Sequence, residues 1–203
     1  MSDNLFFLCG PHGSGKTTLE KSLVSLGEGV VAPELFSRSV KLDTENEAYR
    51  QILKLGSRAI ENFEYLKLAK ENPDKIILGN RCVYDCQAYH WVFKERGWIS
   101  QEKYELYDKF LDINFQGELE SPKAIVLNPG FEVVKRHLEG RWNGNGKKWR
   151  EDDLDYLELA CKAYEKFNGH GKVYYIDHEM NLEDKEEVAD VLCWMEETQG
   201  VLF

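Results

Sequence analysis

Residues 10–17 combine a glycine-rich run with a lysine and a hydroxyl side chain, and these groups can hold phosphate and a metal ion. Their sequence, GPHGSGKT, satisfies the phosphate-binding pattern G-x-x-x-x-G-K-[ST] at every fixed position. Glycines let several backbone N–H groups converge on an anion, because no Cβ stands in the way. We expect Lys16 to reach the β- and γ-phosphates of a nucleotide and the Thr17 hydroxyl to ligate Mg²⁺. The residues expected to bind the nucleotide here are Gly10, Gly13, Ser14, Gly15, Lys16, Thr17 and Thr18.

The elements on either side of this loop have the types that a phosphate-binding loop requires. Residues 5–9 form a short apolar run, which predicts a buried strand. Residues 17–26 predict a helix with Leu19, Leu23 and Leu26 on one side. The N-terminus of that helix adds a partial positive charge at the point where an anion would bind. The order of strand, glycine-rich loop and helix therefore supports a P-loop.

Strands and helices alternate along the rest of the chain. A long helical pattern follows the second strand, with Ile52, Leu55, Ala59, Phe63 and Leu66 on one stripe. Short apolar strands separated by helices predict an α/β fold with a parallel sheet covered on both faces, and ligands at the carboxyl ends of the strands. The later strands are predicted at 30–32, 75–78, 124–127 and 173–176, and the later helices at 84–96, 101–115, from 131 to 138, and around residues 154–164 and 188–195.

Length, charge and cysteine usage narrow the class of protein. The chain of 203 residues suits one domain, residues 1–203, and a net charge of −10 disfavours a nucleic-acid partner. No apolar run approaches the ~20 residues that span a bilayer, so we expect no membrane partner. Five scattered cysteines without a metal-binding set are typical of the reducing cytoplasm.

Three places outside the P-loop carry residues suited to phosphoryl transfer. Glu34 follows the second predicted strand, where a carboxylate could take a proton from a hydroxyl that faces the γ-phosphate. Asn80 and Arg81 follow the third strand. A polar, glycine-rich segment at 141–150 could close as a lid, because the planar fork of arginine binds phosphate oxygens bidentately. The arginines on and around this segment are Arg136, Arg141 and Arg150.

The order and spacing of these segments resemble the deoxynucleoside kinase family, which shares its fold with the thymidylate kinases. The likeness extends from residue 5 to about residue 192, and apart from the P-loop each motif alone is weak. The stretches that carry it are residues 30–34, Gln51 with Arg58, residues 80–85, and Arg136 and Arg141 followed by residues 155–158.

The resemblance implies a three-layer P-loop kinase fold with a five-stranded parallel sheet, helices on both faces and an arginine-bearing lid at about residues 136–150. It implies transfer of the γ-phosphoryl group of ATP, with Mg²⁺, to the 5′-hydroxyl of a nucleoside or deoxynucleoside. Glu34 would be the base and Arg81 would hold the reacting 5′ group. Lys16, Arg136 and Arg141 would stabilise the charge on the moving phosphoryl group.

The same resemblance assigns the residues that would recognise the two substrates. Gln51 would pair with the base of the nucleoside, and Arg58 and Asp85 would complete that side of the site. Asp177 and its neighbours would hold the adenine of ATP. The family also suggests a homodimer formed through a helix face.

Departures from the family pattern leave alternatives open. The family has an acid where this chain has Asn80, so Thr17 and Asn80 are the expected metal ligands, and Glu34 or Asp85 could serve instead. Cys86 replaces an Asp, which leaves the base and sugar preference open. Residues 80–89 also resemble the thymidylate kinases, whose acceptor is a nucleoside monophosphate. A P-loop switch or ATPase is a further alternative, although no apolar strand ends in Asp followed by a switch-like Gly.

Overall fold

The computed structural model describes residues 3–35, 47–145, 150–181 and 184–199, and within them a parallel sheet of five strands with helices on both faces. The predicted α/β fold is confirmed. The strands are β1 (Leu5–Cys9), β2 (Val30–Val31), β3 (Ile76–Asn80), β4 (Lys123–Leu127) and β5 (Val173–Ile176), in the spatial order β2-β3-β1-β4-β5. The helices are α1 (Lys16–Leu26), α2 (Glu47–Glu71), α3 (Val83–Glu95), α4 (Gln101–Asn114), α5 (Phe131–Asn145), α6 (Leu154–Glu165) and α7 (Lys185–Gln199), with a 3₁₀ turn at Gly117–Leu119.

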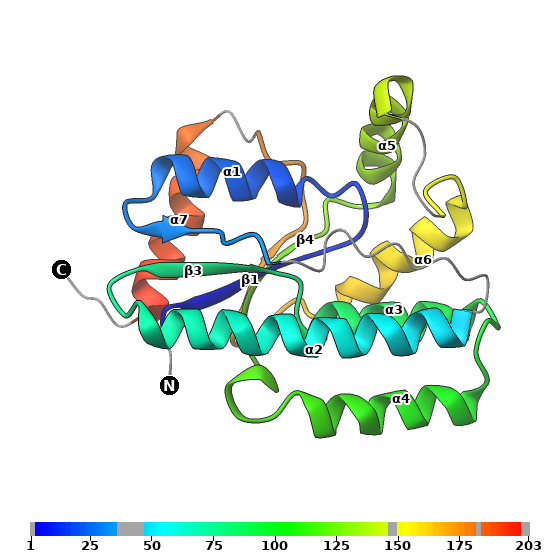
Figure 1. Cartoon of the computed structure of the whole chain (residues 1–203). Helices are drawn as coiled ribbons and strands as arrows, with labels where there is room; N and C mark the ends of the chain where they lie inside the picture. Colours follow the sequence, from blue (N-terminus) through cyan, green and yellow to red (C-terminus); the bar gives the residue numbers. More distant parts are fainter. Residues whose placement is uncertain (1–2, 36–46, 146–149, 182–183, 200–203) are drawn as a thin grey trace.

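The helices form one layer on each face of the sheet. Helices α1 and α7 cover one face, and α2, α3 and α6 cover the other, with α4 beside α2 and α3 (Figure 1). Successive side chains of a strand point to opposite faces. Phe6 and Leu8 of β1 therefore pack with α1 and α7, whereas Phe7 and Cys9 pack with the helices of the other face. All four side chains have no exposed surface.

The register of the sheet brings the two main sequence motifs to the same edge. Leu8 of β1 lies beside Asn80 of β3, and Cys9 lies beside Val126 of β4. The P-loop therefore leaves the sheet next to the segment that follows β3. This edge lies at the carboxyl ends of the strands, where parallel α/β folds bind their ligands. No helix among the described residues is long and apolar enough to cross a membrane.

Two of the predicted apolar stripes are wrong in part. Leu26 is 40% exposed at the end of α1, and Ile52 and Phe63 of α2 are 48% and 51% exposed. The buried side of α2 includes Asn62, which has no exposed surface. Its burial is tolerated because the side-chain amide donates a hydrogen bond to the carbonyl oxygen of Arg81, directly after β3. A stripe built from apolar residues alone passes over the polar Asn62 and therefore assigns Phe63 to the buried side.

The segment predicted as a glycine-rich lid begins as a helix. Helix α5 does not end near residue 138 but continues to Asn145, through Gly140 and Gly144. Glycine weakens a helix through its backbone entropy, but it is tolerated where other contacts hold the helix. Arg141 provides such a contact, because it forms an ion pair with the buried Glu151 beyond the segment.

Candidate phosphate-binding site

The P-loop has a backbone shape that only glycine accepts at its first position. Gly10, Gly13 and Gly15 have φ values of 142°, 78° and 98°, which residues with a side chain rarely adopt. A Cβ at Gly10 would lie 2.2 Å from the carbonyl oxygen of Leu127, so no other residue fits there. Ser14 is buried, and Thr17 and Thr18 are exposed in the first turn of α1.

Lys16 folds back over the loop that precedes it. Its ammonium group donates hydrogen bonds to the carbonyl oxygens of Gly10 and Pro11 over 2.9 and 2.6 Å, and to Ser14 Oγ over 3.2 Å. Burial, followed by the nearby Arg81 guanidinium, lowers the pKa of Lys16 from 10.5 to about 7. A phosphate near this nitrogen would favour its charged form, so the geometry suits an anion.

Arg81 has a strained backbone that its neighbours hold on both sides. Its φ of 69° lies in the left-handed region, which is uncommon for a residue other than glycine. The Arg81 N–H donates to the carbonyl oxygen of Leu8 over 2.9 Å. The Asn62 amide donates to the Arg81 carbonyl oxygen over 3.1 Å. Strain of this kind persists where the surroundings over-determine it, and it concentrates at functional sites.

The Arg81 side chain points back toward the P-loop. Its Nη1 donates to Asp85 Oδ1 over 2.6 Å and lies 3.4 Å from the carbonyl oxygen of Gly10. The guanidinium carbon lies 5.3 Å from the centre of the Tyr89 ring, within range of a cation–π interaction. Lys16 and Arg81 therefore converge on one carbonyl oxygen from two different elements.

Asp85 is a buried carboxylate with several donors. Besides Arg81, the Tyr164 hydroxyl donates to Oδ1 over 2.5 Å and the Cys82 N–H donates to Oδ2 over 3.2 Å. The Asp85 side chain is 4% exposed. Burial raises the pKa of Asp85, but Arg81 and hydrogen bonds from Cys9 and Tyr164 outweigh burial and lower the pKa below its usual value.

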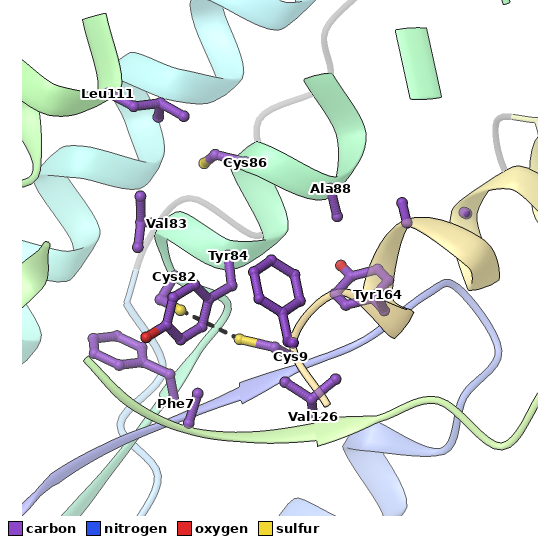
Figure 2. Packing of buried hydrophobic residues seen from close by; sticks show 14 of the residues in the cluster. Phe7, Cys9, Cys82, Val83, Tyr84, Cys86, Ala88, Leu111, Val126 and Tyr164 are labelled. Carbon is purple, nitrogen blue, oxygen red and sulfur yellow. Dashed lines mark hydrogen bonds between the residues drawn. The ribbon is translucent and has the colours of Figure 1, made fainter. Parts of the chain in front are cut away.

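Two cysteines lie beside this carboxylate. Figure 2 shows Cys9 of β1 facing Cys82, which precedes α3, with their sulfur atoms 3.4 Å apart. One ligand atom each from Cys9, Cys82 and Asp85 falls within 4.8 Å of the others, a composition that could suit a metal. Burial raises the pKa of Cys9 well above its usual value, and the oxygens of Asp85 already accept bonds from protein donors. The arrangement therefore favours a protonated Cys9 thiol in a hydrogen bond with Cys82.

His12 of the P-loop faces an aromatic wall. Its ring centre lies 5.6 Å from that of Tyr89 and 6.5 Å from that of Tyr156. Burial, then the positive charges of Arg81 and Lys16, lower the pKa of His12 well below its usual value. The neutral imidazole therefore adds no further charge to this cluster of cations.

The structure separates the two arginines predicted for the lid. Arg141 acts electrostatically on both His12 and Lys16, and its ion pair with Glu151 is largely buried. Arg136 lies outside this cluster and forms an exposed ion pair with Glu179, in the segment after β5. The next residue of α5, His137, binds the carbonyl oxygen of Gly13 and Glu179 Oε1, each over 2.9 Å.

Three further predicted residues belong to the segment after β2 and to α2. Glu34 is exposed in the segment after β2, which the Tyr65 hydroxyl holds through a 3.3 Å bond to the carbonyl oxygen of Pro33. Arg58 binds the carbonyl oxygen of Asn80 over 2.6 Å and forms an ion pair with Glu61. Gln51 belongs to α2, but its side chain lies outside the described residues.

Asp177 lies apart from the cations, at the end of β5. Its side chain is exposed, and it lines a cleft of about 440 Å³. The cleft also includes Gly130 and Phe131, where the chain enters α5, and Tyr175.

Sequence reasoning missed the residues that hold the charged groups in place. Tyr164, Glu151 and Glu179 come from segments far along the chain, and no motif marks them. Asn62 left a signal, because a polar residue stands where the helical spacing of α2 predicts a buried one.

Comparison with known proteins gives one family and one fold. A protein-family model described as deoxynucleoside kinase matches residues 7–198. A search of curated proteins found no match. The chain is similar to deoxyadenosine kinase from M. mycoides with bound dATP, at 15% identity and a TM-score of 0.65, with 95% of this chain and 99% of that chain covered. The same enzyme with the products dCMP and a flexible dCDP aligns at 16% identity and a TM-score of 0.63, again with 95% and 99% covered. At these identities the structures establish a common fold.

Proposed function

Because the chain belongs to the deoxynucleoside kinase family and is therefore an ATP-dependent phosphotransferase that acts on nucleosides, we propose that the transfer takes place between Lys16 and Arg81. The observation that carries this proposal is the convergence of both side chains on the carbonyl oxygen of Gly10, at 2.9 and 3.4 Å. Phosphoryl transfer depends mainly on positioning and on cations placed against the moving charge. Two cations held from different elements fit that requirement.

Each cation has its own role in this scheme. Lys16 lies at the N-terminus of α1 and stabilises the phosphates of the donor. Arg81 lies at the end of β3, beside Asn80, and holds the reacting 5′ group of the acceptor. Arg141 acts on the same cluster from α5 and adds positive charge as the phosphoryl group moves. Arg136 is the outer arginine of the lid, which we place at residues 136–150 of a single kinase domain.

A magnesium ion fits the oxygen donors near the P-loop. The Thr17 hydroxyl is exposed in the first turn of α1, and Asn80 ends the neighbouring strand with a half-buried side chain. Hydroxyl and amide oxygens suit this hard cation, and we assign Thr17 and Asn80 to it. When bound, the ion would neutralise charge on the donor phosphates.

The acceptor side of the site follows the segment after β2 and the helix α2. Glu34 is the base that removes the proton of the 5′-hydroxyl, and its exposure leaves room for a substrate to reach it. Arg58 is fixed by its bond to the Asn80 carbonyl and completes the acceptor side with Gln51. The cleft beside Asp177 receives the adenine of ATP.

A nucleoside monophosphate is the second acceptor class that the site could take. Arg81 and Arg141 both act electrostatically on Lys16. Arg81 would then bind the phosphate of the acceptor, as an arginine fork does well.

The test is ADP release from Mg-ATP with a panel of nucleosides and nucleoside monophosphates. Turnover with a nucleoside supports the main proposal and names the base. Turnover with monophosphates alone moves the acceptor to the second class. ATP hydrolysis that ignores every acceptor contradicts both and favours a switch or ATPase.

The exposed faces of α2 and α4 support a homodimer, which we also propose. Leu106, Phe110 and Ile113 form one exposed stripe on α4, and they are 61%, 37% and 68% exposed. Helix α2 lies beside α4 (Figure 1). It exposes Ile60 and Phe63. Large apolar side chains gathered on two adjacent helices mark an association surface. Ile113→Asp should halve the mass measured by sedimentation equilibrium, and a monomeric wild type would contradict the dimer.

We assign the protein to the cytoplasm. All five cysteines are free thiols, and Cys9 and Cys82 remain unlinked although their sulfur atoms are 3.4 Å apart. Thiols persist where glutathione keeps the compartment reducing. Fractionation of the cells that express the protein tests this assignment.

A further inference from the structure

We propose that Asp85 is a positioning residue: together with Tyr164 it holds the Arg81 guanidinium in place beside the P-loop. The inference rests on the proposed function, because it takes Arg81 to be a cation of the transfer. Asp85 acts through Arg81 and not through contact with the substrate.

The first argument is that protein donors already occupy the carboxylate. Oδ1 accepts from Arg81 over 2.6 Å and from Tyr164 over 2.5 Å, while Oδ2 accepts from the Cys82 N–H over 3.2 Å. These donors come from three places, namely the end of β3, α6 and the N-terminus of α3. A carboxylate bound in this way has little capacity left for a substrate hydroxyl or a metal.

The second argument is that Arg81 needs support from its surroundings. A left-handed backbone is unfavourable at a residue other than glycine and persists only when other contacts impose it. Leu8 and Asn62 bind the Arg81 backbone, and Asp85 binds its side chain. The ion pair spans four residues across the first turn of α3, so it fixes the guanidinium relative to that helix.

Three variants separate these effects. Asp85→Asn removes the charge and keeps the size, whereas Tyr164→Phe removes one donor and keeps the charge. Tyr84→Phe is the matched control, because Tyr84 is also buried on this face of the sheet (Figure 2) but binds the carbonyl oxygen of Pro122. Each variant is measured for kcat, for the KM of the acceptor, for Mg-ATP affinity and for thermal unfolding.

Asp85→Asn should lower kcat about 10- to 100-fold and leave Mg-ATP affinity unchanged, because Arg81 is assigned to the acceptor and Lys16 to the donor. Tyr164→Phe should lower kcat several-fold with the same Mg-ATP affinity, and Tyr84→Phe should change neither. A purely structural role would lower the unfolding temperature and reduce kcat and Mg-ATP affinity together.

Wild-type kcat in folded Asp85→Asn protein would overturn the inference. If that variant does not fold, the kcat of Tyr164→Phe decides, and a value equal to that of Tyr84→Phe contradicts the role of Asp85. If wild type shows no turnover with any acceptor, the proposed function fails by itself. A crystal structure of Asp85→Asn still tests the inference, because a guanidinium of Arg81 that stays beside the Gly10 carbonyl would overturn it.

Discussion

The centre of the site and its lid hold their charged residues in different ways. Lys16 has three hydrogen-bond acceptors in the P-loop, and Arg81 is bound through both its backbone and its side chain. Arg136 of the lid is 59% exposed and binds one carboxylate, Glu179, which is also exposed. Arg141 lies between these cases, because it is 30% exposed and paired with a buried Glu151.

This difference indicates that the centre and the lid contribute to the reaction in different ways. Groups that are fixed before the substrate arrives need no reorganisation during the reaction, and this gives preorganised charges their catalytic value. Groups with exposed, single partners can exchange them for a ligand at little cost, because a surface ion pair is weak. We therefore expect substitutions at the centre to affect turnover more than equivalent substitutions in the lid.

The largest loss should come from Lys16→Ala. Removal of the P-loop cation should lower kcat about 1,000-fold, because Lys16 is the cation that we assign to the donor phosphates. The fold should remain intact, because the variant removes a buried charge whose pKa is already lowered. ADP release and circular dichroism check the two parts, and a folded variant that retains activity would show that the catalytic nucleotide site lies elsewhere.

Glu34→Gln tests the base on the acceptor side. A general base contributes about 100- to 10,000-fold, so kcat should fall by at least about 100-fold while the affinity for Mg-ATP stays constant. Steady-state kinetics at several ATP concentrations separate the two quantities. Equal losses in kcat and ATP affinity would instead assign Glu34 to the binding of the donor.

Alanine substitutions of Arg141 and Arg136 test directly whether a buried partner makes an arginine more important for turnover. Arg141→Ala should lower kcat about tenfold and should lower the unfolding temperature, because a buried carboxylate loses a partner. Arg136→Ala should lower kcat about two- to threefold and leave the unfolding temperature unchanged, because its ion pair is exposed. Equal effects of the two variants would remove the distinction between an inner and an outer lid arginine.

Local features of the molecule could be predicted from the sequence, whereas contacts between distant segments could not. The P-loop, the five strands and the place of Arg81 are local: each depends on neighbouring residues and on apolar runs that one segment contains. The contacts that orient Arg81 join α2, α3 and α6, and the partner of Arg136 lies 43 positions away. Such pairings arise from tertiary packing, which periodicity does not encode. Asn62 combines the two cases. Its polar side chain interrupts the apolar stripe of α2 in the sequence, but only the fold shows the carbonyl that it binds.

Asn80→Asp adds charge at the edge of the central region and should have a smaller effect. If Asn80 faces the metal, a carboxylate there should lower the Mg²⁺ concentration for half-maximal turnover by up to about tenfold. The reason is that a charged oxygen binds the ion better than an amide. Asn114→Asp at the end of α4 is the control for the same change in charge. An unchanged Mg²⁺ titration in Asn80→Asp would place this side chain away from the metal.

The smallest effect is on the pH dependence of stability, and it also arises from the central region. The pKa of Lys16 is about 7 in the folded chain, against 10.5 for an ordinary lysine. Between these values the unfolded chain binds a proton that the folded chain has released, so stability should rise with pH, by at most about 1.4 kcal/mol per pH unit from this group. Buried tyrosines and cysteines with raised pKa values oppose the trend at high pH, so the quantity to measure is the difference between wild type and Lys16→Ala in urea unfolding. Wild type should gain stability relative to Lys16→Ala from pH 7 to pH 9. Saturating Mg-ATP should reduce this gain, because a phosphate beside Lys16 restores its proton. A difference that stays constant over this range would mean that Lys16 keeps its proton in the free enzyme, and that the centre of the site is no more strained electrostatically than the lid.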